Sequence, residues 1–218
     1  MNIDGLIKRY FGDSGTLPVI EEMFDSESIH AVYKDIVNTL KMQPDIELGI
    51  LQTFSYCFYE ILDNVLTHSM KSCGTAVMRY SPEKAKIQIM VVDDGIGIHR
   101  SLTENETYRN ISEAEALAKC MLDRVTDGKG MGFGLYSTAC LIRQAGIVLK
   151  LHSGNHILTT NGVDERIEET DYWKGTVIYF ELYSDKEIDP NKVLENRTDA
   201  VSEFNDEFLD TEDIDNLW

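Results

Sequence analysis

Glu60, Asn64 and His68 form the first group of side chains with chemical potential, since they follow one another at intervals of four residues. Four residues advance about 400° around an α-helix, so these three side chains lie in one stripe on one helix face. Asn64 has a neutral amide oxygen suited to Mg²⁺, and Glu60 has a carboxylate that can orient a hydroxyl group or a water molecule. Taken alone, the pattern is also that of an ordinary amphipathic helix with solvated polar groups.

A second motif, DDGIG at residues 93–97, ends an apolar run and combines the carboxylate of Asp93 with Gly95 and Gly97. Glycines allow the backbone to turn sharply and allow a planar ligand to approach the chain closely. The DxGxG pattern alone has low specificity, because Asp-Gly is also common in ordinary turns.

The third motif is the glycine-rich segment GKGMGFG, in which Gly130, Gly132 and Gly134 come directly before an expected helix. Such glycines expose successive backbone N–H groups, and the helix start adds the positive end of its dipole, so the segment predicts an anion-binding cradle. It is not a Walker A loop, which requires GxxxxGK[ST]. It also lacks the preceding strand and the later acidic residue of a dinucleotide-binding fingerprint.

The elements that position these motifs follow from the periodicity of the apolar residues. Helices are expected over residues 29–40, from about 45 or 46 to about 70, over 112–124 and over 135–145. Strands are expected over residues 76–80, 85–92, 148–152, 156–160 and 176–182. Helices and antiparallel hairpins in this order predict an α+β sandwich, with helices covering one face of a mixed sheet.

Composition excludes several classes of protein. The chain has 218 residues, of which 43% are hydrophobic, so a folded core is expected. Its net charge of −18 repels phosphodiester backbones, and no broad nucleic-acid surface is expected. No apolar run reaches the roughly 20 residues of a membrane span, and no signal peptide is recognisable, so the sequence predicts a cytoplasmic protein. Four scattered cysteines predict neither a zinc site nor a disulfide framework.

The charge is concentrated in residues 185–218, which contain 12 acidic and 3 basic side chains. Within this segment, Val201, Phe204, Phe208 and Leu209 recur at helical spacing. The sequence leaves three interpretations open: a solvated tail, a tail docked on its own domain, and a helix that docks on a partner protein.

In their order and separation, the motifs resemble the conserved boxes of the GHKL ATPases, which share the Bergerat ATP-binding fold. This superfamily contains gyrase B, the large heat-shock chaperone, sensor histidine kinases and mismatch-repair ATPases. ExxxN on a helix, DxGxG after a strand, GxGxGL before a helix and Gly175-Thr176 before an apolar strand resemble its N, G1, G2 and terminal boxes. The resemblance implies a two-layer α/β sandwich with a mixed, mostly antiparallel sheet over residues 46–184. An N-terminal helical extension packed on the core (1–45) and an acidic tail (185–218) would flank it.

The resemblance implies that ATP and Mg²⁺ bind to this domain. Asn64 would bind Mg²⁺, Glu60 would activate the attacking hydroxyl group or water, and Asp93 would accept the adenine amino group. The other implied cofactor-binding residues are Gly95, Gly97, Lys129, Gly130, Met131, Gly132, Gly134, Leu135 and Thr176. Residues 98–128 would form a mobile lid.

His68 resembles the histidine found at this place in many stand-alone kinases of the anti-sigma type, although a structural role for it is also open. Many sensor kinases have a lysine where this chain has Thr67. A helical hairpin with a phosphoacceptor histidine is not expected before the domain, which disfavours a self-phosphorylating sensor kinase.

The function expected from this resemblance is transfer of the ATP γ-phosphate to a protein partner by a stand-alone serine/threonine kinase of the anti-sigma type. The first alternative is an ATPase switch whose lid closure controls a protein interaction without protein phosphorylation. The second is a nucleotide-binding regulator without hydrolysis, and the presence of Glu60 counts against it. Self-association as a homodimer stays open.

Overall fold

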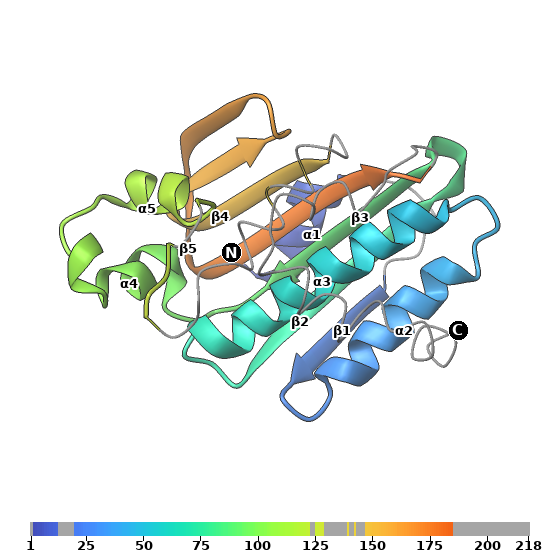
Figure 1. The fold of residues 1–218 in the computed structure, drawn as a ribbon, viewed down its shortest axis with the longest axis horizontal. Helices are drawn as coiled ribbons and strands as arrows, with labels where there is room; N and C mark the ends of the chain where they lie inside the picture. The colour runs from blue at the N-terminus through green and yellow to red at the C-terminus, as the bar shows by residue number, and fades with distance from the viewer. Residues whose placement is uncertain are drawn as a thin grey trace, which may run out of the picture.

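The computed structural model describes residues 2–12, 20–122, 125–128, 139, 142 and 147–184. Its centre is a five-stranded sheet in the order β1-β2-β3-β5-β4, shown in Figure 1. The strands are β1 (Ile20–Asp25), β2 (Cys73–Ser81), β3 (Lys86–Val92), β4 (Val148–Thr160) and β5 (Glu165–Tyr183). All neighbouring strands of this described sheet pair antiparallel, so the expected α+β sandwich is confirmed, whereas the expected parallel component is not found in this part of the chain.

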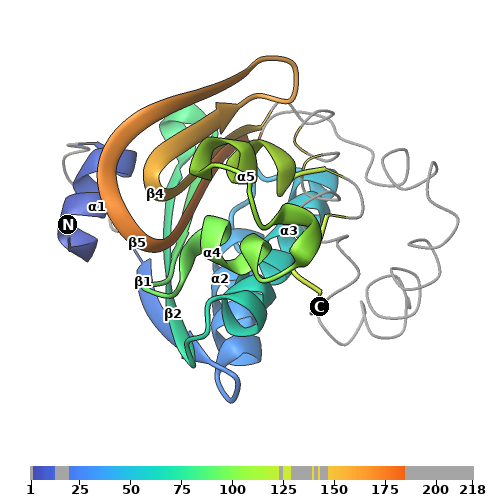
Figure 2. The ribbon, with the colours of Figure 1, turned by 90° about the vertical axis from the view of Figure 1, so that its left-hand side faces the viewer.

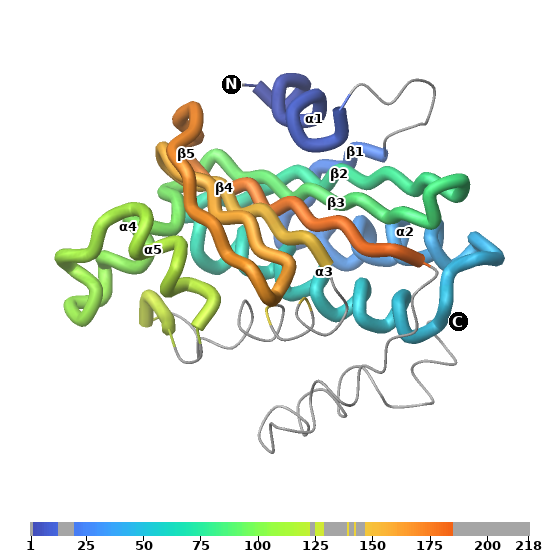
Figure 3. Tube along the Cα trace, turned by 90° about the horizontal axis from the view of Figure 1, so that it is seen from above, coloured from blue at the N-terminus to red at the C-terminus, as the bar shows by residue number. Residues whose placement is uncertain are grey.

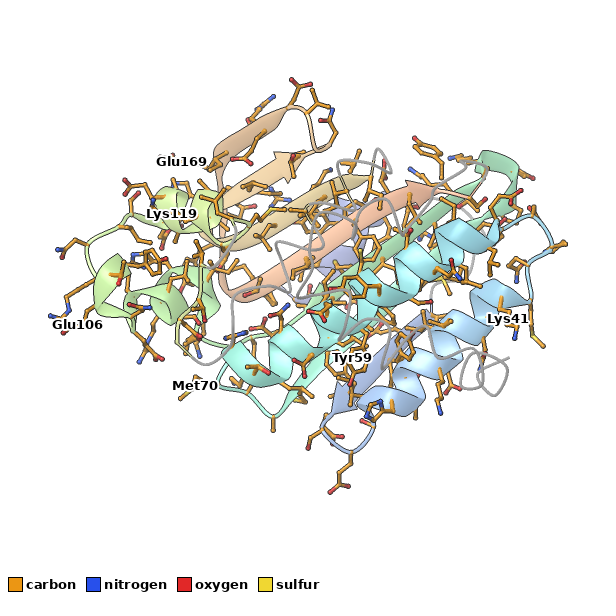
Figure 4. All side chains as sticks on the ribbon, in the orientation of Figure 1. Lys41, Tyr59, Met70, Glu106, Lys119 and Glu169 are labelled. Carbon is orange, nitrogen blue, oxygen red and sulfur yellow. The ribbon has the colours of Figure 1, made fainter. Side chains whose placement is uncertain are left out.

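Two long helices, α2 (Ile29–Lys41) and α3 (Leu48–His68), cover one face of the sheet (Figure 1). Both carry the apolar stripe that predicted them, and that stripe is buried. The rings of Phe54 and Phe58 stack within α3, and each buried side chain of this kind contributes about 1.5 to 3 kcal/mol. Tyr59, labelled in Figure 4, packs its ring edge-on against Tyr33 of α2. The packing therefore fixes which face of α3 points away from the sheet.

A short helix, α1 (Ile3–Phe11), lies on the opposite face of the sheet, as Figure 3 shows. Its apolar residues complete a second buried cluster, made of Leu6, Tyr10, Phe11, Val77, Met90, Val92, Val177 and Tyr179. The buried Arg79 of β2 donates to the carbonyl oxygen of Phe11 at 3.1 Å, where the helix leaves its last carbonyls without partners in the helix. This contact anchors the end of α1 to the sheet.

The segment expected to be a lid contains three short helices, α4 (Gly97–Thr103), η2 (Glu106–Tyr108) and α5 (Glu113–Lys119). Ser112 begins α5 with a capping box, in which its side chain and that of Glu115 each bond the backbone of the other. Leu102 and Leu117 are buried in the same core cluster as α3. Much of the segment is thus packed into the domain.

β1 was not expected from the sequence, and β4 and β5 differ in extent from the strands that were expected. Residues 148–160 form one strand, β4, rather than two, and register shifts beginning at Ser153 mark the place where a break was expected. β5 begins eleven residues earlier than expected, because its polar first half pairs with the second half of β4. Figure 2 shows this long hairpin, which we call the β4–β5 arm, beside α5. A single turn of 3₁₀-helix, η1 (Pro82–Lys84), joins β2 to β3.

Helices long and apolar enough to cross a membrane do not occur among the described residues. The expected helix at 135–145 lies outside the described residues except for positions 139 and 142, and the segment 185–218 lies wholly outside them.

Candidate functional site

Asp93 follows directly after β3, and its side chain is almost completely buried, with the residue 5% exposed. Its backbone N–H donates to the carbonyl oxygen of Thr176 at 3.0 Å, and its Oδ1 accepts the N–H of Gly95 at 2.8 Å. Burial raises the pKa of Asp93 to about 6, although hydrogen bonds from Gly95 and Thr176 act in the opposite direction. A buried carboxylate of this kind favours a ligand that donates a hydrogen bond.

Two glycines of this loop, and a third in β5, allow the chain to pack closely around Asp93. A Cβ on Gly95 would lie 2.2 Å from the carbonyl oxygen of Ser69, and a Cβ on Gly175 would lie 2.2 Å from the carbonyl oxygen of Asp93. Gly97 has a φ of +76° and would meet the hydroxyl of Ser153 at 2.7 Å. These glycines therefore hold the loop, referred to below as the Asp93 loop (93–97), against its neighbours.

The end of α3 supports the Asp93 loop from the helical layer. The N–H of Ile96 donates to the carbonyl oxygen of Ser69 at 2.9 Å, and Lys71 forms an ion pair with Asp94 at 3.0 Å. The DxGxG motif is thus fixed to the residues that directly follow the helix of Glu60 and Asn64.

Glu60 and Asn64 are one turn apart on α3, as the spacing predicted, and both are partly buried. The Nδ2 atom of Asn64 donates to the backbone carbonyl of Glu60 at 2.7 Å. With its nitrogen used in this way, the amide keeps Oδ1 as the atom that can bind a cation.

His68 belongs to a buried network that the sequence did not predict. Its Nδ1 lies 2.8 Å from Oδ2 of Asp127, and the hydroxyl of Ser101 donates to the same oxygen at 2.8 Å. The side chain of Asp127 is 1% exposed. The network links the end of α3, α4 and the residues just before the glycine-rich segment, which supports the structural interpretation of His68.

Ser153, at the irregularity in β4, is a second residue that sequence reasoning missed. Its Oγ accepts the N–H of Ile98 at 3.0 Å and donates to the carbonyl oxygen of Gly175 at 2.9 Å. One buried hydroxyl thereby joins the start of α4 to β5. A lone serine in a strand carries no sequence signal for this role.

The expected phosphate-binding residues lie outside the described part of the chain, namely Lys129, Gly130, Met131, Gly132, Gly134 and Leu135. Within the described part, no group of three or more His, Cys, Asp or Glu side chains could hold a metal ion. Mg²⁺ commonly takes one or two protein ligands and completes its shell with phosphate oxygens and water. The single amide oxygen of Asn64 fits that mode of binding.

A family model described as "Histidine kinase-, DNA gyrase B-, and HSP90-like ATPase" matches residues 51–186, which is more than half of the chain. No curated protein matches the chain. The matched stretch begins within α3 and includes the Asp93 loop and all of β5.

Proposed function

Since this chain belongs to the family of histidine kinase-, DNA gyrase B- and HSP90-like ATPases, a family of ATP-binding domains, we propose that it transfers the ATP γ-phosphate to a protein partner. It would act as a stand-alone serine/threonine kinase of the anti-sigma type. The observation that carries the proposal is the arrangement of α3, which has Glu60 and Asn64 one turn apart and holds the Asp93 loop at its end.

ATP binds with its adenine at the Asp93 loop in this proposal. The carboxylate of Asp93 accepts the adenine amino group, and Gly95, Gly97 and Thr176 lie around it. Asp93 suits this role because it is a buried hydrogen-bond acceptor on a loop fixed from two sides. The phosphates bind to backbone N–H groups of residues 130–135, which carry the GxGxGL pattern, with Lys129 beside them.

Asn64 would hold Mg²⁺ through Oδ1, and the ion would supply positive charge that offsets the charge of the phosphates. Glu60 accepts the proton of the attacking hydroxyl group as that oxygen approaches the γ-phosphorus. The hydrogen bond from Asn64 to the carbonyl of Glu60 supports these roles, because it fixes the orientation of the amide relative to the helix.

An ATPase switch without protein phosphorylation is the second candidate, and the network of Asp127 favours it. Asp127 joins His68 on α3 to Ser101 on α4, so a shift of α3 around bound ATP would be passed to the segment 98–128. Closure of that segment would then alter a surface for a protein partner.

We further propose three parts of the chain: an extension (1–45), an ATP-binding domain (46–184) and an acidic tail (185–218). The extension supports the domain directly, because β1 pairs with β2 and α1 and α2 bury apolar residues on the two faces of the sheet.

The deciding experiment incubates the purified full chain with γ-labelled ATP and Mg²⁺, with and without proteins that co-purify with it. Label on a partner supports the kinase, and release of free phosphate alone supports the switch. Glu60→Gln serves as the control, since it keeps the shape of the side chain and removes the base. If the parent protein gives no more label or phosphate than this variant, the catalytic proposal is wrong.

Binding is tested separately by thermal unfolding. A ligand that binds only the folded state adds about 2.7 kcal/mol of stability at a hundred times its dissociation constant. Magnesium with a non-hydrolysable ATP analogue should therefore raise the unfolding temperature of the parent protein. Absence of any shift at millimolar nucleotide would remove the basis of the proposal.

A further inference from the structure

Trp173 on β5 makes a direct hydrogen bond to the residue proposed to recognise adenine. Its indole Nε1–H donates to the backbone carbonyl oxygen of Asp93 at 2.8 Å. Trp173 is partly buried and packs against the cluster formed by α1 and the sheet. The contact therefore comes from the face of the sheet opposite to α3.

The end of the β3–β5 pairing explains why this carbonyl takes a side-chain donor. The last pair of the register is Val92 with Val177, and the N–H of Asp93 still reaches the carbonyl oxygen of Thr176. Gly175 has no side chain, which lets the Asp93 carbonyl lie close to β5. The indole N–H supplies a donor to a carbonyl beyond the regular pairing, where a buried acceptor without a partner costs about 1 to 3 kcal/mol.

The β4–β5 arm that carries Trp173 is held in turn by α1. His152 is fully buried, and its Nε2 lies 2.9 Å from the carbonyl oxygen of Asp171. Burial lowers the pKa of His152, so the imidazole is neutral; since a carbonyl only accepts, Nε2 carries the proton. Nδ1 then accepts the hydroxyl of Tyr10 at 3.0 Å. An ion pair of Arg9 with Asp171 at 3.5 Å adds to this contact.

We propose that Trp173 is a positioning residue that sets the base selectivity of the nucleotide site by fixing the backbone of Asp93. The inference rests on the proposed role of Asp93 as the acceptor of the adenine amino group. Both peptide groups of Asp93 are held by β5, its N–H by Thr176 and its carbonyl by Trp173. The carboxylate consequently starts from a fixed backbone position, and the N–H of Gly95 holds its Oδ1, so it has little freedom to turn aside when a base presents an acceptor instead of a donor.

Selectivity of this kind comes from the penalty against the wrong ligand. The base of inosine triphosphate has a carbonyl oxygen at C6 in place of the amino group and a proton on N1. If it took the position of adenine, it would bring two acceptors together at Asp93. A rigid site makes that mismatch costly, whereas a loosened site lets the carboxylate move away. Loss of the indole N–H should hence reduce the discrimination between ATP and inosine triphosphate, while the domain still folds.

The test measures dissociation constants of ATP and inosine triphosphate for the full chain and for Trp173→Phe, by calorimetry with Mg²⁺ present. Phenylalanine keeps an aromatic ring in the cluster and removes the donor. The dissociation constant of inosine triphosphate divided by that of ATP measures the discrimination. This ratio should fall about three- to tenfold in the variant, as expected for one lost hydrogen bond. Tyr172→Phe is the matched control, since it changes an aromatic residue at the adjoining position of the strand that is 58% exposed, and its ratio should equal that of the parent.

The outcomes separate this inference from the proposed function. A parent protein that binds ATP no better than inosine triphosphate contradicts the role of Asp93. A parent that discriminates, together with a Trp173→Phe variant that discriminates equally well, overturns the role of Trp173 alone.

A second measurement keeps the inference testable if Trp173→Phe fails to fold. The chain has two tryptophans, so Trp218→Phe leaves Trp173 as its one indole fluorophore. Saturating ATP should shift the emission of Trp173 in this protein, and inosine triphosphate should shift it less. Emission that is unchanged by ATP, while calorimetry shows binding, would contradict the coupling between Trp173 and the site.

Discussion

His68, the last residue of α3, and Asp127, directly before Gly128, are joined by a hydrogen bond of 2.8 Å across 59 positions of the chain. Because Ser101 donates to the same carboxylate oxygen, one buried side chain connects three segments that are separate in sequence. Any opening of the segment 98–128 that moved α4 away from α3 would have to break these bonds.

Ser101→Ala should lower the free energy of unfolding by about 1 to 3 kcal/mol, since it removes a donor from a buried carboxylate. It should also increase proteolytic cleavage within residues 98–128. Urea unfolding and limited proteolysis measure the two effects. Ser26→Ala, at an exposed turn position, is the control and should stay within about 0.5 kcal/mol of the parent. Equal stability of the two variants would show that the Ser101 contact contributes little.

Asp93→Asn should stabilise the protein without nucleotide at high pH. The folded pKa of Asp93, about 6, lies above the ordinary value of 3.8, so the folded state holds this proton more tightly than the unfolded chain. The stability that this proton contributes is complete below about pH 4, is lost as the pH rises to about 6 and stays lost above it. Asparagine avoids that loss, which amounts to about 2 to 3 kcal/mol at pH 8.

The measurement is denaturant unfolding of Asp93→Asn and the parent at pH 4 and pH 8, beside ATP calorimetry. The variant should be about as stable as the parent at pH 4, more stable at pH 8, and weaker in ATP binding. Asp164→Asn is the control, because Asp164 is exposed between β4 and β5, and it should leave the stability unchanged at both pH values. A variant less stable than the parent at pH 8 would contradict the assigned cost of burying the charge.

Gly97→Ala and Gly12→Ala compare two glycines with similar positive φ, +76° and +70°. Both substitutions place a side chain in an unfavourable backbone region, at a cost of about 1 to 3 kcal/mol. Only at Gly97 would the new Cβ also meet neighbouring atoms, and these belong to the support of the Asp93 loop. Gly97→Ala should therefore lose ATP binding and Gly12→Ala should keep it, as measured by calorimetry. Equal ATP affinities of the two variants would mean that the Asp93 loop tolerates displacement by the new side chain.

Glu60→Gln should leave ATP affinity close to that of the parent and reduce turnover about 10²- to 10⁴-fold, the range for loss of a general base. Asp63→Asn, at an exposed position of the same helix, should leave both unchanged. Calorimetry and phosphate release separate the two quantities. If Glu60→Gln turned over ATP at the rate of the parent protein, a group other than Glu60 would have to be the general base.

The sequence predicted the helices α2 and α3 and the hairpin of β2 and β3, because each has a regular apolar face that the fold buries. It did not predict β1 or the first half of β5. The segment 165–175 is mostly polar, and pairing with β4 rather than burial makes it a strand. Periodicity detects burial, so strands that are defined by pairing alone escape it.

The candidate site was predicted in part for a similar reason. Glu60, Asn64 and Asp93 belong to short motifs with fixed spacing, which can be recognised along the chain. Ser153 and Trp173 support the same loop from the β4–β5 arm, yet they are far from it in sequence and belong to no motif. Their roles follow only from strand pairing, which the sequence alone did not fix.

The pairing of β3 with β5 also decides when the site can form during folding. The β2–β3 hairpin is local, whereas β5 joins β3 only after a long loop has closed, and such non-local pairing is slow. A nascent chain that has emerged only as far as β3 has Asp93 but lacks Thr176 and Trp173. The proposed ATP site can therefore form only once β5 has been added. Bound nucleotide should slow unfolding of the finished domain and leave the rate of its first folding steps unchanged.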